Sequence, residues 1–78
     1  MKYILGIDVG TTGTKSALFS EKGNLVDIEY KSYTIKYPKE GWAEQDPEDW
    51  WNALIETATK VVARNKASND IISLSLST

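Results

Sequence analysis

Two strand-forming runs separated by a short turn open this chain, and they constrain its fold more than any other feature. Residues 3–9 (YILGIDV) are rich in β-branched and aromatic side chains, and residues 15–20 (KSALFS) form a second such run. The residues between them, 10–14 (GTTGT), are only glycine and threonine, which suit a tight turn. Since a short turn joins neighbouring strands in antiparallel fashion, the sequence predicts a hairpin here.

The chain continues with a third strand and a loop. Residues 21–24 (EKGN) are a second turn signal, in which Gly23 or Asn24 can take a positive φ. A strand over about 25–34 follows this turn, and a loop over 37–46 leads out of it.

A helix and a last strand complete the predicted elements. Asp46 and Pro47 favour a helix start, because aspartate caps free N–H groups and proline fits the first turn. We expect the helix to end within 66–69 and to bury one apolar face. That face consists of Trp51, Leu54, Ile55, Ala58 and Val62. Residues 71–77 (IISLSLS) alternate apolar residues with serines, which predicts a strand whose serines face a packed layer.

The predicted order is β-β-β-α-β, which indicates an α/β fold. The three strands joined by short turns should be antiparallel, whereas the helix crossover lets the last strand run parallel to one of them. A chain of 78 residues buries only about 60% of its unfolded surface, so we expect a marginal core. An unpaired edge strand would allow homo-oligomers to form edge to edge.

Composition excludes several kinds of site. The chain has no cysteine and no histidine, which excludes disulfides, a Cys/His zinc site and a serine–histidine catalytic unit within it. Nine scattered basic residues and a net charge of −2 give no sign of a nucleic-acid partner. No apolar run approaches the roughly 20 residues that cross a bilayer. We therefore expect a cytoplasmic protein with no nucleic-acid or membrane partner.

The turn and its flanks carry groups suited to phosphate chemistry. Asp8 ends a buried strand and offers a hard oxygen ligand for Mg²⁺, while Lys15 adds a positive charge. Gly10 and Gly13 allow the backbone to approach a ligand, and its N–H groups can form an anion-binding nest. Hydroxyl donors come from Thr11, Thr12 and Thr14. Phosphoryl transfer needs such groups, but from these residues alone a plain hairpin turn is an equal alternative.

Two familiar phosphate loops do not match this segment. A Walker loop needs a glycine directly before its Lys-Ser pair and a helix after it, whereas Thr14 precedes Lys15 here and a strand-like run follows. The glycines at positions 6, 10 and 13 do not have the dinucleotide-binding spacing.

Two motifs together resemble one known family. Residues 6–15 (GIDVGTTGTK) resemble the first phosphate motif of the FGGY carbohydrate kinases, a branch of the actin/Hsp70/sugar-kinase superfamily. Residues 37–51 (YPKEGWAEQDPEDWW) resemble a second segment of that family, in the same order and at about the same distance. The resemblance covers the whole chain. It implies a ribonuclease H-like fold in which residues 1–78 are the incomplete N-terminal part of the kinase's N-terminal domain.

The resemblance also implies cofactors and roles for individual residues. It implies ATP and Mg²⁺, with transfer of the γ-phosphoryl group to a sugar hydroxyl. Asp8 matches an auxiliary catalytic residue near the metal, and is not the general base. The phosphate-contacting positions are Gly10, Thr11, Thr12 and Lys15. The family's general base and sugar-binding residues lie downstream, so we expect the 78 residues alone to be inactive.

Within the family, xylulose or a related pentulose is the expected substrate. Lys15 stands where glycerol kinases have arginine, and the AEQDPEDWW stretch favours xylulose over gluconate or glycerol, which are the alternatives. Two other classes stay open: an actin- or Hsp70-like ATPase that uses hydrolysis for conformational change, and a non-catalytic interaction module. The second motif argues against the ATPase.

Overall fold

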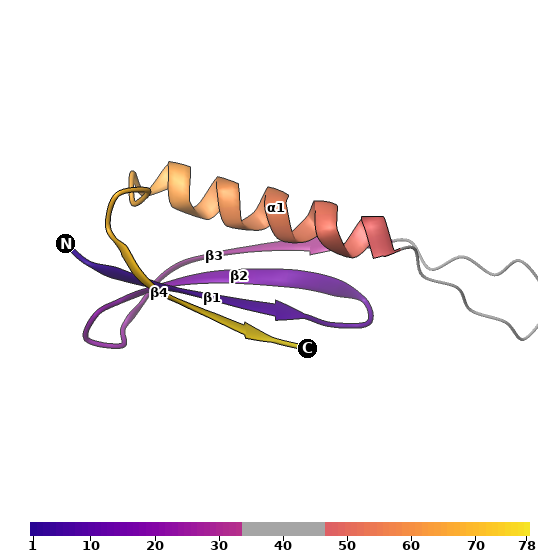
Figure 1. The fold of residues 1–78 in the computed structure, drawn as a ribbon, viewed down its shortest axis with the longest axis horizontal. Coiled ribbons are helices and arrows are strands. Elements are labelled where there is room, and N and C mark those ends of the chain that lie inside the picture. Colours follow the sequence, from indigo (N-terminus) through magenta and orange to yellow (C-terminus); the bar gives the residue numbers. More distant parts are fainter. Residues whose placement is uncertain (34–46) are drawn as a thin grey trace, which may run out of the picture.

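The computed structural model describes residues 1–33 and 47–78, which form one four-stranded sheet with one helix on it. The elements are β1 (Tyr3–Val9), β2 (Gly13–Ser20), β3 (Leu25–Ser32), α1 (Pro47–Arg64) and β4 (Ile71–Ser77). The strands lie in the order β3-β2-β1-β4, with β2 antiparallel to both its neighbours and β4 parallel to β1 (Figure 1). The predicted element order and the single parallel pair are confirmed.

The strand ends differ slightly from those predicted. β2 begins at Gly13 rather than at Lys15, because Gly13 and Thr14 already pair with the last residues of β3. The turn between β2 and β3 is confirmed, and Gly23 takes a φ of 89° there. β3 ends at Ser32, before the predicted end near Thr34, and Tyr33 already lies beyond the strand. The predicted loop over 37–46 and the Asp46 cap lie outside the described residues.

The C-terminal end of α1 comes before the predicted range and is closed by two backbone bonds. Ala67 N donates to Val62 O at 3.0 Å, and Lys66 N donates to Ala63 O at 3.1 Å. Lys66 has a φ of 53°, the left-handed conformation that commonly ends a helix. Ala67 is fully buried in the core, so the end of the helix is fixed by packing as well.

The core lies between α1 and the sheet, but the buried face of the helix is not the predicted one. Its buried residues are Ala53, Thr57 and Val61, which contribute a stripe at helical spacing. Trp51 is 62% exposed and Ile55 is 46% exposed, so the prediction was wrong for these two. The other three predicted residues, Leu54, Ala58 and Val62, are half-buried. The small side chains of the buried stripe let the helix backbone approach the sheet closely. A prediction that places only the most apolar residues in the core does not identify such a face.

Two fully buried hydroxyl groups join the helix to the sheet. Thr57 Oγ1 donates to the Ala53 carbonyl at 2.8 Å, and the same oxygen lies 2.7 Å from Ser16 Oγ. Because a threonine hydroxyl has one proton, Ser16 is the donor to Thr57. Neither side chain is accessible to solvent. The contact between α1 and β2 therefore depends on a hydrogen bond in the dry interior.

We expect the two hydroxyls to behave as a unit. Thr57→Val should lower the free energy of unfolding by about 1–3 kcal/mol, because the Ser16 hydroxyl then has no acceptor. Ser16→Ala should cost about 1 kcal/mol, since Thr57 keeps its bond to Ala53. The double variant should lose less than the sum of the two. Urea unfolding of the four proteins measures this coupling, and additive losses would contradict it.

An ion-pair network ties the end of α1 to β3. Arg64 Nε lies 2.8 Å from Asp27 Oδ2, and Arg64 Nη1 lies 2.8 Å from Glu29 Oε2. Asn65 Nδ2 donates to Asp27 Oδ2 at 2.7 Å, and the Ile28 N–H donates to Asp27 Oδ1 at 2.8 Å. The hydrogen bond from Arg64, then those from Asn65 and Ile28, hold the pKa of Asp27 well below its usual value.

This network should make stability depend on pH. Because the pKa of Asp27 is lower in the folded chain than in the unfolded chain, the unfolded state takes up the proton first. The stabilisation is complete at neutral pH and decreases as the pH falls from about 5 towards 2. Asp27→Asn should lower the urea midpoint at pH 7, and its difference from the wild type should shrink at pH 3. A difference that does not change with pH would contradict this.

The helix leaves part of the sheet uncovered. Among the described elements, α1 packs on β2, β3 and β1 but not on β4. On the helix side of β4, Ile72, Leu74 and Leu76 are therefore exposed. The opposite face of the sheet has no helix on it within residues 1–33 and 47–78, and it carries the candidate site.

Candidate functional site

The predicted site residues gather at one end of the sheet. The β1–β2 turn, the end of β4 and the first turn of α1 all lie at this end (Figure 1). A hollow of about 270 Å³ lies between them, lined by Val9, Gly10, Thr11, Trp50 and Thr78. The residues predicted to contact phosphates or metal are all exposed at this end of the sheet: Asp8, Gly10, Thr11, Thr12 and Lys15. Gly10 and Thr11 line this hollow, whereas Asp8 and Lys15 line a second one.

Asp8 and Lys15 lie directly opposite each other. They are register partners on β1 and β2, and both line a hollow of about 250 Å³ on the sheet face opposite the helix. Gly6 and Ala17 line the same hollow, where their small size leaves space above the strands. An acidic and a basic group therefore flank one open surface, which is suited to a metal-bound polyanion.

Ser77 is a site residue that the sequence did not reveal. It is the register partner of Asp8 on the other side of β1, and its Oγ donates to Asp8 Oδ1 at 3.2 Å. Ser73, Ser75 and Ser77 are all exposed, so the prediction that these serines face a packed layer was wrong in the described structure. Only the parallel register between β1 and β4 places Ser77 beside the carboxylate.

The turn itself is held by hydrogen bonds to its carbonyl groups. Gly10 N donates to Gly13 O at 2.9 Å, and Tyr33 N donates to Thr12 O at 3.1 Å. Tyr33 Oη also donates to Gly10 O at 2.9 Å and lies 2.8 Å from Thr14 Oγ1. Thr14 is fully buried, so its hydroxyl is a structural group rather than the phosphate donor that was expected.

Gly13 is needed for a reason other than the predicted one. Its φ is not positive, and Gly23 is the one glycine of the described residues with a positive φ. A Cβ at Gly13 would collide with the Tyr30 ring and would lie 2.7 Å from the Lys31 carbonyl oxygen. The glycine therefore allows β3 to pack closely on β2, rather than allowing a ligand to approach.

The donor set fits one kind of metal ion. Asp8 is the single acidic residue lining its hollow, and no three acidic, histidine or cysteine side chains cluster within the described ranges. Such a site cannot enclose a cation. One carboxylate does suit Mg²⁺ that is otherwise held by water and nucleotide phosphates.

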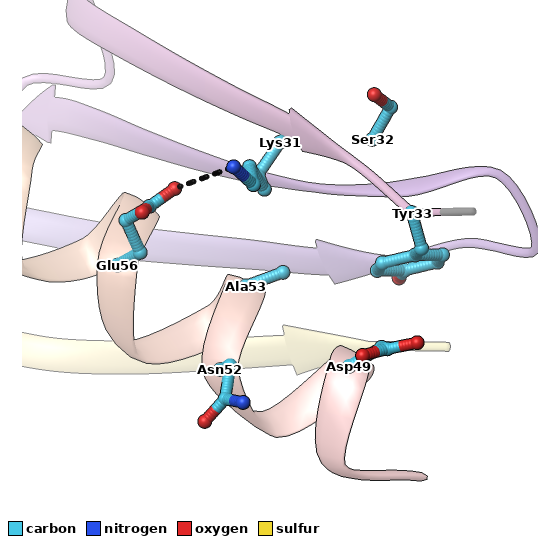
Figure 2. Close-up of a pocket in the computed structure, with 7 residues that line it drawn as sticks. All are labelled: Lys31, Ser32, Tyr33, Asp49, Asn52, Ala53 and Glu56. Carbon is cyan, nitrogen blue, oxygen red and sulfur yellow. Dashed lines mark ion pairs between the residues drawn. The ribbon is translucent and has the colours of Figure 1, made fainter. Parts of the chain in front are cut away.

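A larger hollow, of about 440 Å³, lies elsewhere, between the end of β3 and the start of α1 (Figure 2). Its lining residues are Lys31, Ser32, Tyr33, Asp49, Asn52, Ala53 and Glu56. Lys31 Nζ lies 3.6 Å from Glu56 Oε2 across it, and Asp49 adds a second carboxylate, so this lining is more acidic than basic and does not suit phosphates. Asp8 and Lys15 do not line it.

In the parts of the chain described, no helix is long and apolar enough to cross a membrane.

The sheet order and the exposed turn place the chain in the class of α/β proteins with the actin-like sugar-kinase fold. More particularly, the chain belongs to the FGGY family of carbohydrate kinases, whose N-terminal domain matches residues 3–78. The resemblance of the two motifs is thereby confirmed at the level of the family.

Individual relatives agree with this assignment. A glycerol kinase of Fusobacterium nucleatum is 40% identical over 77 residues, which are 97% of this chain and 16% of that protein. A xylulose kinase from Lactobacillus acidophilus superposes with a TM-score of 0.86 at 36% identity, over 97% of this chain and 15% of that one. A gluconate kinase from the same organism superposes with a TM-score of 0.85 at 36% identity, over 96% of this chain and 15% of that one. The chain thus spans about one sixth of the length of these relatives.

Proposed function

We propose that the protein containing this chain is an ATP-dependent carbohydrate kinase that transfers the γ-phosphoryl group of ATP to a sugar hydroxyl. The observation that carries the proposal is that Asp8 and Lys15 are register partners on adjacent strands, beside an exposed glycine–threonine turn, in a chain of this family. Residues 1–78 would be the first, incomplete part of the kinase's N-terminal domain. The general base and most sugar contacts would come from other parts of the protein, which we place in the cytoplasm.

Each site residue has a distinct proposed role. Asp8 would orient Mg²⁺, directly or through its waters, and Ser77 would orient the Asp8 carboxylate. Thr11 and Thr12 would donate hydrogen bonds to the phosphates, while Lys15 would offset their negative charge. Gly10, whose N–H already donates to the Gly13 carbonyl, would let the turn come close to the phosphates. A Mg²⁺ ion held at Asp8 would supply further charge neutralisation. Such a site works by positioning and by electrostatic stabilisation, which are the main requirements of phosphoryl transfer.

For the acceptor we propose xylulose or a related pentulose. The family resemblance implies arginine rather than Lys15 in glycerol kinases, and a xylulose kinase superposes on this chain with a TM-score of 0.86. Glycerol is a second candidate, since a protein named glycerol kinase is 40% identical to this chain. Gluconate is a third, supported by the similarity to a gluconate kinase.

A substrate panel tests the proposal. The full-length protein is assayed with Mg-ATP and coupled detection of ADP, with xylulose, other ketoses, gluconate and glycerol supplied singly. We expect ADP release that depends on one acceptor, with xylulose giving the highest kcat/KM. The highest value with glycerol would overturn the pentulose assignment alone. ATP hydrolysis that no acceptor stimulates would overturn the kinase and favour the ATPase class.

A further inference from the structure

Tyr33 lies just beyond β3 and makes three hydrogen bonds to the β1–β2 turn and its flank. Its N–H donates to the Thr12 carbonyl at 3.1 Å, and its phenolic oxygen donates to the Gly10 carbonyl at 2.9 Å. The same oxygen lies 2.8 Å from Thr14 Oγ1. Since a phenol has one proton and Gly10 takes it, Thr14 is the donor in the contact with Tyr33.

These bonds determine how the turn's peptide groups are oriented. In a planar trans peptide, the C=O and the following N–H point in opposite directions. Tyr33 draws the Gly10 carbonyl towards the helix side of the sheet, where the buried Thr14 also lies. The N–H of the same peptide, which belongs to Thr11, therefore points away from Tyr33. Gly10 and Thr11 line the hollow at this end of the sheet, next to the strands that carry Asp8 and Lys15.

Three carbonyl oxygens of the turn are also engaged inside the protein and are thereby kept from facing an incoming anion. The Gly10, Thr12 and Gly13 oxygens all accept hydrogen bonds inside the protein, two of them from Tyr33. A carbonyl oxygen turned towards a phosphate would repel it, whereas an N–H group attracts it. A turn without Tyr33 would have to be ordered when the nucleotide binds, and that ordering reduces affinity.

We propose that Tyr33 is a positioning residue that holds the β1–β2 turn ready for the phosphates of a nucleoside triphosphate. This inference rests on the proposed function. Tyr33 does not touch the nucleotide in this arrangement, because it contacts the turn from the helix side and its ring lines the separate hollow of Figure 2. Its effect is transmitted through Gly10 and Thr14.

The test compares Tyr33→Phe with the wild type in the full-length protein. This change removes the hydroxyl and keeps the ring, so we expect the KM for Mg-ATP to rise about three- to tenfold, while the KM for the sugar stays unchanged. A simple loss of folded protein would lower the apparent kcat and leave both KM values unchanged. Tyr3→Phe is the matched control, because Tyr3 begins β1 at the far end of the sheet; it should leave both KM values unchanged.

A second pair of variants keeps the test decisive if Tyr33→Phe unfolds the protein. Thr14→Val removes the donor to Tyr33 and should raise the KM for Mg-ATP about two- to threefold, whereas Thr14→Ser keeps the donor and should not. An unchanged KM for Mg-ATP in Tyr33→Phe, or in Thr14→Val where the first variant does not fold, would overturn the role of Tyr33 and leave the kinase intact. A wild-type protein that neither binds nor turns over Mg-ATP would instead overturn the proposed function, and this inference with it.

Discussion

On the proposed kinase function, replacing Asp8 by Asn in the full-length protein is expected to lower kcat for sugar phosphorylation by about 100-fold or more. The amide has nearly the shape of the carboxylate and keeps an oxygen to accept the Ser77 hydroxyl, which lies 3.2 Å from Asp8 Oδ1. What it lacks is the negative charge that would orient Mg²⁺. The loss should therefore fall on the chemical step, and thermal unfolding should be nearly unchanged. Steady-state kinetics with Mg-ATP and the best acceptor, together with a melting curve, measure both effects.

The matched control for this variant is Asp70→Asn. Asp70 precedes β4 and its carbonyl accepts from Tyr3 N at 2.8 Å, so it lies at the opposite end of the sheet. The same loss of one charge there should change kcat less than twofold, because the site lies too far away to be affected. Equal kinetic effects from the two variants would show that Asp8 has no special part in the reaction.

The second large effect concerns stability, and we expect it from Leu18→Ala. Leu18 is fully buried and belongs to the core cluster with Ile7 and Val61, so the change leaves a cavity between the sheet and the helix. Its cost should be about 3 kcal/mol. A folded chain of this size has a total free energy of unfolding of roughly 4–12 kcal/mol, so the variant would lose a large part of it. Urea unfolding of the 78-residue chain, followed by circular dichroism, gives the value.

Leu25→Ala provides the comparison for this measurement. It deletes the same atoms from a leucine on β3 that is 58% exposed, so little buried contact is lost. We expect a change of less than about 1 kcal/mol. Similar losses in the two variants would contradict the assignment of the core to the space between α1 and β2.

Much of the fold could be predicted because its signals are local. The β2–β3 turn depends on one glycine, which has a φ of 89°. The β4 strand is recognised from apolar residues and serines that alternate within seven residues. The buried face of α1 could not be predicted in the same way. Trp51 and Ile55 have the apolar character of core residues, yet the helix buries the smaller Ala53 and Thr57 instead. That choice depends on how closely the helix approaches β2, which no local pattern encodes.

The candidate site, too, could be predicted only in part. The order of the elements and the residues around the turn could be predicted, because propensity, turn chemistry and motif spacing act over short stretches of chain. The contacts of Ser77 with Asp8 and of Tyr33 with Gly10 could not, since these pairs are 69 and 23 residues apart and meet only in the folded chain. Both contacts depend on strand register, because a shift of one residue would turn Ser77 or Tyr33 to the opposite face of the sheet.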